Sequence, residues 1–135
     1  MRHWRLTVDP FAPLLEGKQP TLESALDFTK QIRREFHEAT ALRVDARVVH
    51  EAGGGEAQEL AYMLAAGVAL LRAGEGRGLA PNETGVATLF TIAVGPDVIV
   101  EIAKLRAARL LWAAGTGGVR RKGADALCTP SPAGG

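Results

Sequence analysis

The residues best suited to chemistry lie in one short stretch, where His50 and Glu51 precede three consecutive glycines, Gly53, Gly54 and Gly55. A histidine beside a carboxylate is a combination used in general acid–base catalysis. A glycine turn ahead of a helix can hold a phosphate or carboxylate on its backbone N–H groups. Each feature also has a plainer interpretation. The glycines match neither the P-loop nor the GxGxxG pattern and suit a flexible turn, and a histidine at a strand end needs no catalytic role.

Three charged residues of alternating sign precede this stretch: Arg43, Asp45 and Arg47. On an extended strand they would share one face, where they would either be solvated or neutralise one another inside a barrel. Arg47 is also a candidate for meeting a phosphate, together with Glu51 and the glycine turn. His50 and Glu51, as neighbours on the same strand, would point to opposite faces.

The elements that position these residues follow from the hydrophobic pattern. Alternating apolar and polar residues are typical of strands, and apolar residues three or four positions apart are typical of amphipathic helices. Irregular connections are expected at 11–17 and 79–84. Strands are predicted at residues 4–8, 42–48 and 86–94, and helices from 21 to about 37–40, from about 60 to 73–74, and from 95–97 to 112.

The last of these helices is expected to begin with Pro96 at its first position and to bury an apolar side. Glu101 stands three residues before Lys104, a spacing at which ion pairs form on a helix. The apolar side comprises Val98, Ile102, Leu105 and Trp112, and the polar side comprises Glu101, Lys104, Arg106 and Arg109.

Three consecutive βα units predict an α/β fold, because helical crossovers make successive strands parallel. Three units are too few to close a TIM barrel, which needs eight. The predicted architecture is an open sheet, a partial TIM barrel over residues 1–114. An uncovered edge strand promotes association, so we expect a homo-oligomer that completes or covers the sheet. Residues 115–135 are rich in Gly, Pro and Ala and are predicted to form a disordered tail.

The composition restricts the class of protein. A formal net charge of +1 over 135 residues leaves no dominant basic face, which argues against nucleic-acid binding. No apolar run is long enough to predict a membrane span, and no leader sequence is predicted. Cys128 is the single cysteine, which fits a reducing cytoplasm. His3 and His37 have no metal-ligand spacing with His50, so no metal site is predicted.

Longer phrases add a resemblance to a known family. Residues 45–73, DARVVHEAGGGEAQELAYMLAAGVALLRA, and residues 98–113, VIVEIAKLRAARLLWA, resemble the methylmalonyl-CoA mutase family. VDPFAPLLEG, residues 8–17, is similar to another segment of the same family, and the resemblance covers roughly residues 5–114. It implies that the chain corresponds to part of the acyl-CoA-binding TIM-barrel domain, whereas a separate Rossmann-like domain of the family carries adenosylcobalamin.

The chain departs from the catalytic members of that family in two ways. The resemblance implies a Tyr-His pair in the pattern Y-H-x-x-E-A-G, in which the histidine hydrogen-bonds the thioester carbonyl. Arg47 and Val48 occupy these positions, and His50 stands two places too late to substitute. The cobalamin signature D-x-H-x-x-G is absent, because Asp45 precedes His50 by five residues. These departures make the chain similar to the small, non-catalytic subunit, as a truncated fragment.

Two functions follow as hypotheses. The first is a non-catalytic subunit fragment that assembles with itself or with a catalytic large subunit and binds no adenosylcobalamin alone. The second is a component that still binds an acyl-CoA or cobalamin for the isomerase reaction, the intramolecular transfer that interconverts methylmalonyl-CoA and succinyl-CoA. An unrelated small α/β ligand-binding module is a third alternative, which the family phrases disfavour. The candidate substrate-binding residues of the second hypothesis are Arg47, His50, Glu51, Gly53, Gly54 and Gly55.

Overall fold

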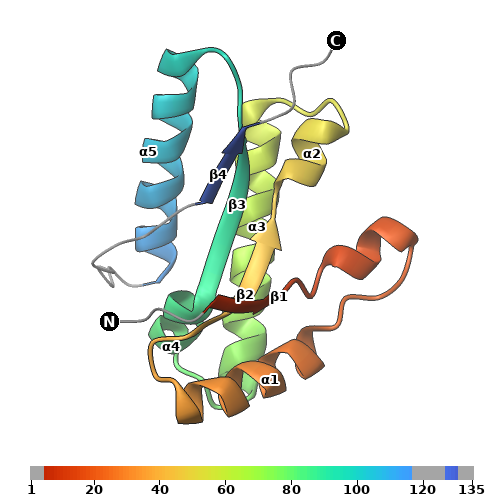
Figure 1. Ribbon diagram of the computed structural model, residues 1–135, viewed down its shortest axis with the longest axis vertical. Helices are drawn as coiled ribbons and strands as arrows, with labels where there is room; N and C mark the ends of the chain where they lie inside the picture. The colour runs from red at the N-terminus through yellow and green to blue at the C-terminus, as the bar shows by residue number, and fades with distance from the viewer. Residues whose placement is uncertain (1–4, 117–126, 131–135) are drawn as a thin grey trace.

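The computed structural model describes residues 5–116 and 127–130 (Figure 1). Among the helices in these ranges, none is long and apolar enough to cross a membrane. The elements follow in the order β1 (Arg5–Val8), the 3-10 helix η1 (Ala12–Glu16), α1 (Leu22–Glu35), β2 (Thr40–Asp45), α2 (Arg47–Glu51), α3 (Glu56–Gly76), α4 (Pro81–Ala87), β3 (Thr88–Val94), α5 (Val98–Gly115) and β4 (Leu127–Pro130).

The strands form one open sheet in the order β1-β2-β3-β4, and every neighbouring pair is parallel. The first three strands are the three that the sequence predicts, so the α/β fold with an open, partial-barrel sheet is confirmed. Leu42 lies opposite Thr88 and Asp45 opposite Thr91, so β3 continues beyond the end of β2 to Val94. Because the strands share one direction, their carboxyl ends meet at the same end of the sheet.

The fourth strand lies in the segment that the sequence predicts to be a disordered tail. In β4, Leu127 pairs with Thr91 and Pro130 with Val94 of β3. An edge strand offers unpaired N–H and C=O groups to any extended segment, and periodicity within the tail gives no sign of this. The residues of the tail at 117–126 and 131–135 lie outside the described part of the chain, so a domain division at residue 114 stays a prediction.

The core lies between one face of the sheet and the helices that cover it. Leu42 of β2, Leu26 of α1 and Leu70 of α3 are fully buried and belong to one cluster. A second cluster joins Met63 of α3 to Ile92 of β3. Burial of one such side chain contributes about 1.5–3 kcal/mol, so these contacts hold the helices on the sheet. Figure 1 shows the result, with α3 passing behind β2 and β3.

The second strand is shorter than predicted. It ends at Asp45, and α2 follows in place of a strand that would reach Val48. The Asp45 carboxylate accepts a hydrogen bond from the Arg47 backbone N–H at 3.2 Å, a local turn contact that competes with the sheet ladder. This contact overrides the strand propensity of the β-branched residues that follow. His50 and Glu51 therefore lie on a helix and not on opposite faces of a strand.

A short helix, α4, replaces the surface loop predicted at 79–84. Pro81 occupies its first turn, where a missing N–H leaves no hydrogen bond unmade. The Glu83 carboxylate accepts the Ala80 backbone N–H at 2.8 Å, which satisfies a donor at the helix start. Proline favours turns and helix starts alike, and here the helix start prevails. Strand β3 consequently begins at Thr88 and not at residue 86.

The last helix, α5, begins at Val98, two positions later than expected. Its N-cap is Asp97, whose Oδ1 accepts the N–H groups of Ile99 and Val100, each at 3.2 Å. An aspartate at this position also interacts favourably with the helix dipole. Pro96 therefore precedes the cap and does not occupy the first helical position.

The side of α5 that faces the protein differs in part from the prediction. Leu105 and Trp112 are half-buried as expected, but Val98 and Ile102 are exposed. Glu101 and Lys104 are buried, whereas Val98, Ile99 and Leu110 are 67%, 81% and 73% exposed. The expected ion pair is confirmed, with Lys104 Nζ 2.9 Å from Glu101 Oε2. A helical period identifies residues that share a face, but it does not say whether the neighbouring helix offers an apolar or a charged partner. Here α3 offers carboxylates.

Gly67 of α3 allows α5 and β3 to approach closely. A Cβ at this position would lie 2.5 Å from Trp112 Cζ3 and 3.1 Å from Phe90 Cζ. These two rings already pack edge to face, with centroids 4.6 Å apart.

Gly67→Ala is expected to lower the free energy of unfolding by about 1–3 kcal/mol through overpacking, as measured by urea denaturation followed by circular dichroism.

Gly76→Ala on the same helix is the matched control, because nothing lies within 4 Å of a Cβ there. This substitution is expected to raise the free energy of unfolding by about 0.5 kcal/mol, since alanine has the higher helix propensity. Equal effects of the two substitutions would contradict the close approach at Gly67.

Candidate functional site

The candidate residues gather at the carboxyl ends of β2 and β3, where ligands bind in parallel α/β folds. Helix α2 follows β2 directly, and the glycine turn leads into the first turn of α3 (Figure 1). Two groups of charged side chains occupy this end of the sheet, and we call the second the Lys104 cluster. The first group is Arg43, Asp45 and Arg47, and the Lys104 cluster is Glu56, Glu59, Glu101 and Lys104.

Arg47 forms an ion pair with Asp45. Its Nε lies 2.8 Å from Asp45 Oδ1, and its terminal nitrogen pairs with Oδ2, a bidentate geometry that strengthens an ion pair. Arg43 adds a longer contact of 3.8 Å to the same carboxylate. Burial alone would raise the pKa of Asp45, but the hydrogen bond and charge of Arg47 hold that pKa below its usual value. The three residues thus pair with one another, but Arg47 lies on α2 and does not share a strand face with Arg43 and Asp45.

The three glycines make a tight turn between α2 and α3. Gly53 has a φ of +87°, a conformation that favours glycine, and a Cβ on Gly54 would lie 2.5 Å from Val49 Cγ1. Gly55 is the N-cap of α3, and its N–H donates to Gln58 Oε1 at 2.8 Å. The geometry of the turn thus requires glycine, and the Gly55 N–H is already hydrogen-bonded within the chain. Both observations favour a structural turn over an anion-binding site.

The Lys104 cluster surrounds one ammonium group with three carboxylates. Lys104 Nζ donates to Glu59 Oε2 at 3.0 Å, to the Ala93 carbonyl oxygen at 2.7 Å, and to Glu56 Oε2. Glu101 Oε2 lies 2.9 Å from the same nitrogen. The side chain of Lys104 is 1% exposed and that of Glu59 is fully buried. The ion pairs with Glu59 and Glu101 therefore lie inside the protein, where solvent screens them little, whereas the Glu56 side chain is 34% exposed.

The glutamates of this cluster also hold the backbone at the end of β3. Glu59 Oε1 accepts the Ala93 N–H at 2.6 Å, and Glu101 Oε1 accepts the Gly95 N–H at 2.9 Å. Burial alone would lower the pKa of Lys104, but its hydrogen bonds to the carboxylates raise that pKa above its usual value. The ammonium group therefore stays charged, and one set of charged hydrogen bonds joins α3, β3 and α5.

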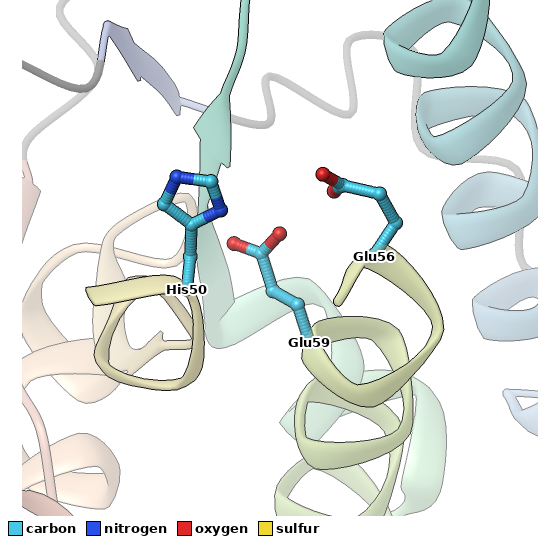
Figure 2. Close-up of side chains that lie close together, drawn as sticks. All are labelled: His50, Glu56 and Glu59. Carbon is cyan, nitrogen blue, oxygen red and sulfur yellow. The ribbon is translucent and has the colours of Figure 1, made fainter. Parts of the chain in front are cut away.

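His50 approaches this cluster from α2. Figure 2 shows its ring beside the carboxylate of Glu59, with the carboxylate of Glu56 turned towards both. One ligand atom from each of these three side chains lies within 4.8 Å of the others. Glu51, the neighbour that the sequence offers as a partner, is exposed at the end of α2. The carboxylates beside His50 therefore come from α3.

A cavity of about 120 Å³ opens at the ends of β1 and β2. Asp9 uses both of its carboxylate oxygens on backbone N–H groups, those of Phe11 and Asp45, each at 3.0 Å. Burial, with the charges of Asp9 and Asp45, raises the pKa of Tyr62, so its hydroxyl stays protonated at neutral pH. The cavity is lined by Asp9, Phe11, Ala12, Leu15, Arg43, Asp45, Val48 and Tyr62.

The structure distributes the predicted binding residues over three places. His50 lies at the Lys104 cluster, Arg47 at Asp45, and Glu51 on the exposed end of α2. Sequence reasoning missed Glu59 as a site residue, although one signal was present. Glu59 stands at the helical spacing of the buried Met63, Ala66 and Leu70 of α3, and a charge on a core-facing stripe requires a partner.

A family model described as methylmalonyl-CoA mutase matches residues 14–124. The chain belongs to the methylmalonyl-CoA mutase family. It is 33% identical over 109 residues to the methylmalonyl-CoA mutase small subunit of Propionibacterium freudenreichii subsp. shermanii, which covers 80% of this chain and 17% of that protein. It is 49% identical over 73 residues to the small subunit of Streptomyces virginiae (54% of this chain, 12% of that protein) and 36% identical over 95 residues to the large subunit of the same organism (70% and 13%).

Small and large subunits of the mutase family are thus both similar to this chain. The chain spans between 12% and 17% of the length of these curated relatives. The matched residues include α2, the glycine turn and every member of the Lys104 cluster. The candidate site therefore lies within the mutase-like part of the chain.

The Lys104 cluster provides a test of what holds this mutase-like fold together. Lys104→Met keeps the length of the side chain but leaves three carboxylates without their ammonium group. Removing one partner of a buried ion pair costs about 3–5 kcal/mol. The variant is therefore expected to lose about that much free energy of unfolding in urea denaturation.

Lys18→Met is the matched control, because Lys18 pairs with Glu16 where the two side chains are 69% and 64% exposed. Exposed ion pairs contribute about 0–1 kcal/mol, so the control should unfold at nearly the same urea concentration as wild type. If Lys104→Met proves as stable as Lys18→Met, the cluster does not join α3, β3 and α5.

Proposed function

We propose that this chain is a small-subunit-like, non-catalytic part of a cobalamin-dependent methylmalonyl-CoA mutase that acts by assembly with itself or with a catalytic large subunit. The observation that carries the proposal is the pair Arg47–Val48, which stands where the family resemblance implies a Tyr-His pair. The similarity to relatives named small subunit supports the same subtype. A single cysteine in the chain favours a reducing compartment, and we infer the cytoplasm.

The geometry at these two positions supports the absence of a catalytic pair. Val48 has no polar group in its side chain and cannot donate a hydrogen bond to a thioester carbonyl. The guanidinium of Arg47 is held by Asp45, so its donors are directed at a carboxylate of the chain itself. His50, two positions later, lies beside Glu56 and Glu59 (Figure 2).

Adenosylcobalamin does not fit the residues in this part of the mutase. The family signature places an aspartate two residues before its histidine, whereas Asp45 precedes His50 by five. The cavity beside β1 and β2, about 120 Å³, is smaller than the roughly 300–1,000 Å³ of typical small-molecule sites. We therefore infer that any cobalamin belongs to another part of the mutase, and we assign no step of the isomerisation to these residues.

Two uncovered surfaces give assembly a physical basis. β1 is an edge strand on which Leu6 and Val8 are exposed, and edge strands readily pair with further strands. Apolar residues that are scattered singly are normal on a protein surface, but a row of them along one helix marks an interaction surface. α5 exposes several apolar side chains, of which Ile99 and Leu110 lie on the side opposite the buried Glu101 and Lys104, with the exposed Arg106 between them. The others are Val98, Val100, Ile102 and Leu111.

Assembly through α5 predicts an oligomer that two substitutions weaken. Native mass spectrometry and analytical ultracentrifugation should show a dimer or larger species of the purified chain, or a complex when it is mixed with a catalytic mutase large subunit. Ile99→Asp combined with Leu110→Asp should weaken this association by about tenfold or more, because burial of each aliphatic side chain contributes about 1.5–3 kcal/mol.

Leu15→Asp is the control for a new charge on an exposed apolar position, because Leu15 is 68% exposed but belongs to η1. It should leave the association constant unchanged. A wild-type chain that remains monomeric at all concentrations, alone and with the large subunit, would contradict the proposed assembly.

The cavity at β1 and β2 favours a second candidate, an acyl-CoA-binding component of the isomerase. It places Arg43 and the protonated Tyr62 beside the apolar Phe11 and Leu15, a combination that suits a carboxylate or phosphate with an apolar neighbour. At about 120 Å³ it would hold one end of an acyl-CoA and not the whole molecule. The same native mass spectra, recorded with methylmalonyl-CoA or succinyl-CoA, separate the two candidates. A stoichiometric adduct that Arg43→Ala abolishes would favour the binding component over assembly alone.

Restoring the missing pair tests the non-catalytic assignment. The double variant Arg47→Tyr with Val48→His is expected to show no turnover of methylmalonyl-CoA to succinyl-CoA with adenosylcobalamin, measured by chromatography of the acyl-CoA products. The reason is that these 135 residues span 17% or less of the length of the relatives they match, and two restored side chains do not by themselves make a substrate site. Turnover above the wild-type background would refute the non-catalytic role.

A further inference from the structure

We propose that His50, Glu56 and Glu59 form a binding site for one divalent cation of the zinc class. His50 belongs to α2, and the two glutamates belong to the first turn of α3, beyond the glycine turn (Figure 2). This site is separate from the assembly surface of α5, so the proposal does not depend on the proposed function.

The three side chains are nearly close enough to share one ion. Their ligand atoms all lie within 4.8 Å of one another, and two ligands held about 2.0–2.2 Å from one Zn²⁺ are at most about 4.4 Å apart. Glu59 is fully buried, whereas His50 and Glu56 are only partly buried. The site thus combines one fixed ligand with two that have room to close on a cation.

The charge of the Lys104 cluster favours a cation at this place. Glu56, Glu59 and Glu101 carry three negative charges against the one positive charge of Lys104, which leaves a formal charge of −2. Uncompensated charge inside a protein is costly. A divalent cation beside Glu56 and Glu59 neutralises this excess.

The hydrogen bonds of Lys104 show the same deficit independently of any ligand spacing. An ammonium group has three N–H donors, and those of Lys104 go to Glu56, Glu59 and the Ala93 carbonyl oxygen. Glu101 Oε2 is buried and, among the described residues, receives no hydrogen bond, although it lies 2.9 Å from the ammonium nitrogen. The cluster therefore contains more carboxylate oxygens than one ammonium group can donate hydrogen bonds to.

Lys104 and a bound cation can occupy the cluster together. Each carboxylate has two oxygens and about four acceptor positions, and Lys104 takes one position on Glu56 and one on Glu59. Carboxylates that ligate metal ions are usually hydrogen-bonded by a neighbouring group that fixes their orientation. Lys104 supplies that hydrogen bond to both glutamates.

The donor set indicates the class of ion. One imidazole nitrogen with two carboxylate oxygens suits Zn²⁺ and related first-row ions, whereas Ca²⁺ and Mg²⁺ prefer oxygen ligands alone. Three protein ligands leave the fourth position of a tetrahedral ion for water or for a group from a partner chain. The sequence predicts no metal site because its histidines lack ligand spacing, and only the fold brings the α3 glutamates to His50.

Isothermal titration of the chain with Zn²⁺ tests the proposal, in a Cys128→Ser background that removes the single thiol. One Zn²⁺ per chain is expected. His50→Ala and, separately, Glu56→Gln should each weaken binding by about tenfold or more, because loss of even an indirect partner of a metal costs about 10–100-fold. Co²⁺ should give the visible absorption bands of a ligated ion in the parent chain and not in His50→Ala.

His37→Ala is the control, because His37 is an exposed histidine between α1 and β2. It should leave the Zn²⁺ affinity unchanged. A cation that binds only the folded chain raises the melting temperature, so Zn²⁺ should raise the Tm of the parent and of His37→Ala by more than that of Glu56→Gln. The Glu56→Gln variant also serves if His50→Ala fails to fold. Absence of stoichiometric binding, or equal loss in His37→Ala and the two site variants, would mean an adventitious ion only and would overturn the proposal.

Discussion

The fold depends on one buried ammonium group. Lys104 of α5 binds carboxylates from the first turn of α3, and two of the surrounding glutamates accept backbone N–H groups at the end of β3. Taking such charges out of water costs several kcal/mol per ion, which is recovered only where geometry and further hydrogen bonds are good. Here all three ammonium donors are used, and the glutamates fix Ala93 and Gly95. The cluster therefore specifies how α3, β3 and α5 meet more than it adds to their stability.

The same cluster determines which side of α5 reaches solvent. A helix can present only one side to the sheet, and burial of Glu101 and Lys104 turns Ile99 and Leu110 outwards. The position of α5 is then secured by Trp112, which packs against Phe90 and over Gly67. The apolar outer surface is thus a consequence of the charged interior, and the proposed assembly uses what the ion pairs leave uncovered.

The parts of this structure that sequence could predict are those that depend on local pattern. The three strands, the helices between them and the Glu101–Lys104 pair follow from residues a few positions apart. The end of β2 does not, because one hydrogen bond from the Arg47 backbone N–H to the Asp45 carboxylate decides it against the strand propensity of the next residues. The orientation of α5 does not either, because Glu56 and Glu59 are 48 and 45 positions away from Lys104. The sequence segments that resemble the family contain Glu59 and Lys104, but sequence similarity does not show which side chains these two residues contact.

The two charged groups at the carboxyl ends of the strands differ in how far they satisfy themselves. Beside β2, two aspartates and two arginines balance in charge. Asp45 pairs with Arg47 and contacts Arg43, and the Asp9 carboxylate accepts hydrogen bonds from backbone N–H groups. Beside β3, three carboxylates share one ammonium group, and Glu101 Oε2, 2.9 Å from that group, receives no hydrogen bond from the described residues. The charges therefore balance at the position where the family resemblance implies catalysis. The neighbouring group beside β3 keeps a net negative charge. This distribution is the reason that we propose a cation beside β3 and no catalytic role for Arg47 and Val48.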